Sequence, residues 1–137
     1  MSLETLLLLV AGLQLAIAIL NLFLVPLLKW QADLARAPLL LREVFQVHAW
    51  FISVTLTIFA LLTLRFSHEM ATGSNIVATW LAGAIGTFWA IRTILQIVYY
   101  SSTHWRGQAV RTAIHISLLF LYGGFAAAYI SAAWSLK

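Results

Sequence analysis

Four long runs of apolar residues follow one another along the chain, separated by short polar links. Each run has about 20 residues or more, the length that an α-helix needs to cross ~30 Å of hydrocarbon. The apolar positions do not alternate with a period of two, and strands of a membrane barrel would need only about ten residues each. The pattern therefore predicts four transmembrane helices, at residues 5–28, 44–64, 76–100 and 109–134.

The links between these predicted helices are short, at residues 31–41, 66–75 and 101–108. Short links favour antiparallel packing of helices that are adjacent in sequence. We therefore expect an all-α fold, an up-down four-helix bundle in the membrane, formed by one domain that comprises residues 1–137. In the second link, Gly73 followed by Ser74 or Asn75 is typical of a helix end and a new helix cap.

Composition supports the membrane assignment, because 63% of the residues are hydrophobic and only 9% are charged. Soluble domains carry roughly 25% charged residues. The net charge is +4, but the basic residues are scattered among links and helix ends and form no basic stripe, so we do not expect nucleic-acid binding. The chain has no cysteine, which leaves histidine as its only strong ligand for a soft metal.

The distribution of basic residues predicts the orientation of the chain in the membrane. The side that holds the second link and the chain ends has only Arg65 and Lys137, so the positive-inside rule places the first and third links in the cytoplasm. Both termini should then lie outside, in a multi-pass protein of a bacterial inner membrane. The basic residues in and beside the first and third links are Lys29, Arg36, Arg42, Arg106 and Arg111.

Arg92 lies inside the third apolar run, where a charged side chain is costly. The fold must supply it with a hydrogen-bond partner, a water-filled cavity or an anionic ligand. Gln96 and Arg92 lie within about two turns of the end of this run. His48 and His115 lie a few residues inside helices that enter the membrane from that same side, so we expect these four side chains at a similar depth.

Two histidines at one depth on parallel helices could be the axial ligands of a haem b. This arrangement resembles membrane cytochromes b in outline, a likeness that covers the helix number and the two histidines. Under this hypothesis His48 and His115 are the metal ligands, and Arg92 pairs with a propionate or polarises a quinone carbonyl. Gln96 or Tyr99 would complete the hydrogen bonds. The sequence thus predicts a haem-binding or quinone-reactive electron-transfer subunit.

Other interpretations stay open. The polar residues could satisfy only each other and the backbone, and the glycine and alanine faces could bind partner helices in a non-enzymatic subunit or scaffold. A small transporter is a third possibility, in which Arg92 lines an anion path. In each case we expect contact with the lipid bilayer and assembly as a homo-oligomer or within a larger membrane complex. A di-iron carboxylate site is excluded, because the chain has four acidic residues and no Glu-x-x-His pair.

The orientation can be tested with single cysteines, because the chain has none of its own. A cysteine at Thr72 should react with an impermeant thiol reagent added to intact cells, and a cysteine at Ala35 should not, because the positive-inside rule places Ala35 in the cytoplasm. Strong labelling at Ala35 would invert the orientation.

Overall fold

The computed structural model describes residues 1–99 and 109–134 of the chain. All secondary structure in these two stretches is α-helical, and four of the helices are long and apolar enough to cross a membrane. The predicted fold class, an all-α membrane bundle, is confirmed. The helices are α1 (Leu3–Leu22), α2 (Leu24–Leu27), α3 (Gln31–Arg36), α4 (Leu39–Thr72), α5 (Ile76–Val98) and α6 (Ala109–Trp134).

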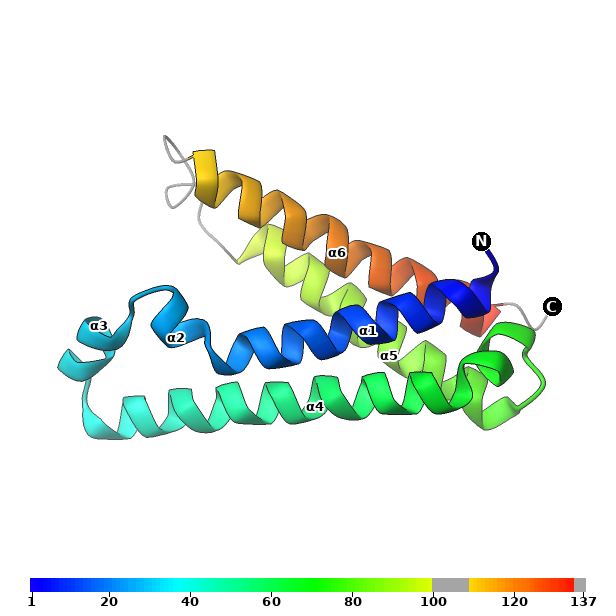
Figure 1. Ribbon diagram of the computed structural model, residues 1–137, viewed down its shortest axis with the longest axis horizontal. Helices are drawn as coiled ribbons and strands as arrows, with labels where there is room; N and C mark the ends of the chain where they lie inside the picture. Colours follow the sequence, from blue (N-terminus) through cyan, green and yellow to red (C-terminus); the bar gives the residue numbers. More distant parts are fainter. Residues whose placement is uncertain (100–108, 135–137) are drawn as a thin grey trace. The chain divides into compact units, whose positions relative to one another are not determined.

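The helices belong to two compact units, each of which is described here by itself. Unit 1 comprises Met1–Leu7 and Phe66–Lys137 and contains α5 and α6, whereas unit 2 comprises Leu8–Arg65 and contains most of α1 and α4. The boundary within α4 coincides with a kink, because Phe66 has non-helical backbone angles (φ −118°, ψ 17°). In each unit two long helices lie side by side and run in opposite directions (Figure 1).

The first predicted helix is shorter than expected, since α1 ends at Leu22 and not at residue 28. Pro26 explains the break, because a proline ring clashes with the carbonyl group four residues earlier, here that of Leu22. After α2 the chain turns at Lys29, whose φ of 56° lies in the left-handed region. The N–H groups of Lys29 and Trp30 donate to the carbonyl oxygens of Pro26 and Val25, the pattern of a Schellman cap.

The second predicted helix is longer than expected, since α4 extends over 34 residues. It begins directly after Pro38, a residue that is well tolerated at the start of a helix. No helix breaker follows until Gly73, whose φ of 65° allows the chain to turn. Much of the predicted 31–41 and 66–75 links is therefore helical. Asn75 then caps α5 as predicted, because its side chain accepts hydrogen bonds from the N–H groups of Val77 and Ala78.

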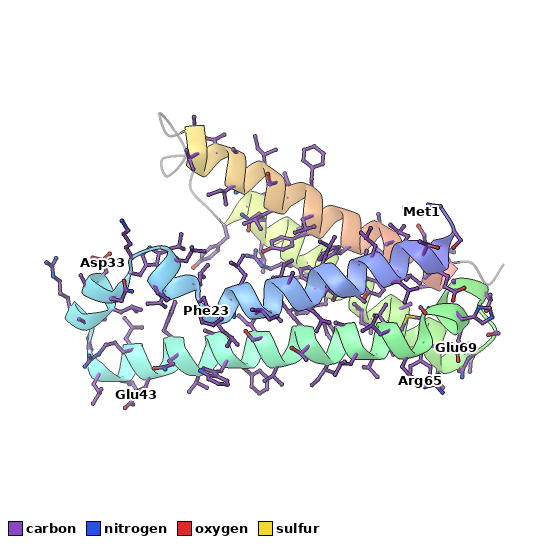
Figure 2. The ribbon with its side chains drawn as sticks, viewed as in Figure 1. Met1, Phe23, Asp33, Glu43, Arg65 and Glu69 are labelled. Atoms are coloured by element: carbon purple, nitrogen blue, oxygen red, sulfur yellow. The ribbon has the colours of Figure 1, made fainter. Side chains whose placement is uncertain are left out.

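In unit 2, amide and hydroxyl groups join α1 to α4. The Asn21 side-chain amide donates to the carbonyl oxygen of Ala49 at 2.7 Å and to Ser53 Oγ at 2.9 Å. Charged residues lie toward the ends of this unit, with Asp33 in α3, Glu43 near the start of α4, and Arg65 at the last position of the unit, just before the kink at Phe66 (Figure 2). The other small or amide residues on the same face of α1 are also buried, namely Ala11, Gln14 and Ala18.

In unit 1, glycines on α5 allow α6 to approach closely. A Cβ added at Gly83 would lie 3.6 Å from the Cβ of Ala133, and one added at Gly86 would lie only 3.1 Å from the backbone nitrogen of Ile130. Such contacts are typical of membrane helices, which pack through small residues because lipid gives little hydrophobic drive for association. Gly83 and Gly86 thus permit the close packing of α5 on α6.

Gly86→Ala should weaken the packing of α5 on α6, because the new Cβ would crowd the backbone of Ile130 and the Cβ of Tyr129. Overpacking of this kind typically costs about 1–3 kcal/mol. Gly124→Ala is the matched control, since a Cβ there meets no atom within 4 Å and the gain in helix propensity is the same. Unfolding in detergent should show a lower stability for Gly86→Ala than for Gly124→Ala. Equal stabilities would contradict the close approach.

Candidate functional site

The candidate site is built around Arg92, a half-buried residue in the second half of α5. Its Nη1 donates to Gln96 Oε1 at 2.9 Å, one turn further along the helix. Side chains at positions i and i+4 of a helix lie on the same face, which allows Arg92 and Gln96 to meet. Six residues separate Arg92 from Val98, the last residue of α5, a rise of about 9 Å along the helix.

Gln96 connects this arginine to α6. Its side chain is buried, with 3% of its surface exposed, and its Nε2 lies 2.9 Å from Nδ1 of His115. An arginine side chain can only donate hydrogen bonds, so the Gln96 oxygen must face Arg92 and its NH₂ group must face His115. The structure therefore brings Arg92, Gln96 and His115 together in one chain of hydrogen bonds across the two helices of unit 1.

Aromatic rings of α5 and α6 pack beside the guanidinium group of Arg92. The guanidinium carbon of Arg92 lies 4.9 Å from the centre of the Tyr122 ring, within the range of a cation–π contact. Tyr122 in turn stacks on Trp89, with ring centres 5.2 Å apart, and Phe125 meets Trp89 edge-on at 4.8 Å. These rings are buried and hold Tyr122 in place. We call Arg92, Gln96, His115 and Tyr122 the arginine cluster.

The arginine cluster carries a positive charge without a carboxylate partner in the described parts of the chain. The hydrogen bond to Gln96 and the contact with Tyr122 are the interactions that Arg92 makes there. The Glu4 carboxylate, which also belongs to unit 1, contacts His68, with Oε2 3.2 Å from Nδ1. The remaining N–H groups of Arg92 are therefore available to an oxygen acceptor.

His48 and Tyr99 are the other two predicted site residues. His48 belongs to unit 2, where its exposed ring donates from Nδ1 to the carbonyl oxygen of Val44 at 2.9 Å. Tyr99 is the C-cap of α5 and is exposed. The hydrogen bonds that the structure describes in the arginine cluster join Arg92, Gln96 and His115, all within unit 1. The predicted roles of His48 as haem ligand and of Tyr99 as hydrogen-bond donor stay predictions.

Sequence reasoning missed Tyr122 as the ring that receives Arg92. The signal was present in the helix faces, because Trp89, Arg92 and Gln96 are three and four residues apart and so share one face of α5. Tyr122 lies seven residues after His115, which puts both on one face of α6. Aligning the two faces in antiparallel order would have matched Gln96 with His115 and Arg92 with Tyr122.

Comparisons of the chain with protein-family models, curated proteins and solved structures give no match. Within the described residues, no group of three or more histidine, aspartate or glutamate side chains is placed to hold a metal ion. The arginine cluster is therefore the feature of the molecule from which a function can be inferred.

Proposed function

We propose that this multi-pass membrane protein binds a lipid-soluble ligand through an oxygen acceptor at the arginine cluster, and that the ligand is a quinone. The observation that supports this proposal most is the charge of Arg92, which has no carboxylate partner in the described part of the chain. A charge held within a membrane helix is costly and is usually retained for function. A quinone carbonyl accepts hydrogen bonds and enters from the lipid phase.

The contacts of Arg92 favour a ligand over a purely structural role. A structural role would be served by a nearby carboxylate, whereas Gln96 and the Tyr122 ring hold the guanidinium in place and leave its charge intact. With the first and third links in the cytoplasm, the arginine cluster would lie near the cytoplasmic side. In an electron-transfer complex this site would hold the quinone while a partner subunit supplies or takes up the electrons.

The haem hypothesis has a separate basis in His48. Its Nδ1–H donates to the Val44 carbonyl, which leaves the lone pair on Nε2, the arrangement common among histidine ligands. A haem held by His48 and His115 would give a Soret band that shifts on reduction, and His115→Ala would abolish its low-spin form. A quinone site without haem gives no such spectrum, so absorption of the purified protein separates the two hypotheses.

Arg92→Leu should lower the affinity for decylubiquinone by at least about tenfold, because hydrogen bonds to charged groups contribute about 1.5–3 kcal/mol. Binding can be measured by quenching of tryptophan fluorescence in nanodiscs. The variant should still insert and stay helical, since a leucine is favourable within a membrane helix. Arg65→Leu, at an exposed site within α4, is the control and should bind as the wild type does.

Two outcomes would contradict the proposal. Unchanged affinity of Arg92→Leu would show that Arg92 does not contact the quinone. Absence of decylubiquinone binding by the wild-type protein would favour the alternative function, a non-enzymatic subunit or scaffold that binds partner helices.

A further inference from the structure

Gln96 is the central residue of the arginine cluster, and its geometry limits what the neighbouring histidine can do. The Gln96 side chain is 3% exposed and makes two hydrogen bonds of 2.9 Å, one to Arg92 and one to His115. Because Arg92 can only donate, Gln96 Oε1 is the acceptor and its NH₂ group is turned toward His115. The amide cannot be turned round without placing N–H groups of Arg92 and Gln96 against each other.

This orientation fixes the tautomer of His115. Nδ1 of His115 faces an N–H donor, so it must be the acceptor and carry the lone pair. In a neutral imidazole the proton is then on Nε2. We infer that Gln96 is a positioning residue. Its amide is oriented by the N–H donors of Arg92, and in this orientation it holds His115 as the Nε2–H tautomer.

His48 provides the opposite case within the same chain. A backbone carbonyl oxygen can only accept, so Nδ1 of His48 must donate to Val44, and its Nε2 carries the lone pair. His48 and His115 thus have opposite tautomers. The difference follows from their partners, a carbonyl oxygen for His48 and an amide NH₂ for His115.

The tautomer of His115 defines the class of ligand, an inference that rests on the proposed function. With Nδ1 engaged by Gln96 and a proton on Nε2, His115 has no lone pair to give to haem iron or to another metal. Arg92 likewise offers only donors. The arginine cluster is therefore suited to an oxygen acceptor, such as a quinone carbonyl, and not to a metal. A haem ligated by His115 would need the opposite tautomer and the loss of the Gln96 hydrogen bond.

The tautomers can be measured directly, without any ligand. Protein with ¹⁵N-labelled histidine, in nanodiscs at pH 8, gives two-bond ¹⁵N–¹H correlation patterns that differ between Nδ1–H and Nε2–H imidazoles. His115 should show the Nε2–H pattern and His48 the Nδ1–H pattern, and His115→Asn and His48→Asn assign the signals. We expect the Nε2–H tautomer of His115 to be at least about ten times more populated than the Nδ1–H tautomer, because the latter would place its Nδ1–H against the NH₂ group of Gln96. An Nδ1–H pattern at His115 would overturn the inference.

Gln96→Glu should reverse the tautomer of His115, because both carboxylate oxygens are acceptors and favour a proton on Nδ1, which then donates a hydrogen bond to the carboxylate, with the lone pair on Nε2. The same change should weaken decylubiquinone binding at least about tenfold, since the carboxylate would also pair with Arg92. Gln46→Glu, the same substitution at an exposed site on α4, should leave both histidine patterns unchanged. An Nε2–H pattern that persists in Gln96→Glu would show that Gln96 does not set the tautomer.

The two measurements keep the inference separate from the proposed function. If the wild-type histidine patterns are as expected but decylubiquinone does not bind, Gln96 still positions His115 and the quinone proposal fails. If decylubiquinone binds and His115 shows the Nδ1–H pattern, the positioning role fails and the quinone site stands. If Gln96→Glu does not fold, the ¹⁵N–¹H spectrum of the wild-type protein alone still tests the tautomer of His115.

Discussion

The cost of holding the Arg92 charge within a membrane helix is the constraint on which the rest of unit 1 depends. On insertion scales this cost is about 2.5–3.5 kcal/mol at the centre of a helix. A hydrogen bond to Gln96 and a ring contact with Tyr122 reduce it without cancelling the charge. The chain thereby keeps a cation that can attract an acceptor, which an ion pair with a carboxylate would have neutralised.

The close packing of α5 on α6 makes this arrangement possible. Gly86 lets the two backbones approach, and the buried ring of Trp89, which Phe125 meets edge-on, stacks against Tyr122. Gln96 can then span the gap to His115 with a single amide group. A small residue, Gly86, thus helps to determine the distance between Gln96 and His115 further along the same pair of helices. The site is a consequence of helix packing, because each of its members lies on a helix and none on a link.

Much of this unit could be predicted from the sequence. The length of the apolar runs located the long helices, and the rise per residue put Arg92, Gln96 and His115 at similar depth. The helix ends that differed from the prediction belong to α1 and α4, most of which lie in unit 2, and they have local causes. A proline clash ended α1 early, and the lack of a helix breaker before Gly73 lengthened α4. The pairing of Arg92 with Tyr122 was missed, although the shared faces of α5 and α6 carry the signal for it once the two helices are aligned in antiparallel order.

Unit 2 shows why polarity alone does not indicate a ligand site. Asn21 is also a polar residue in an apolar helix, but it is neutral, and both of its amide contacts are with α4. An amide that finds its partners within the bundle fixes the packing of two helices, which is the usual role of such residues in membranes. Arg92 differs because its contacts use only some of its N–H donors, and neither the Gln96 amide nor the Tyr122 ring neutralises its charge. The unbalanced charge, and not the presence of polar atoms, is what distinguishes a candidate binding site from a packing contact in this protein.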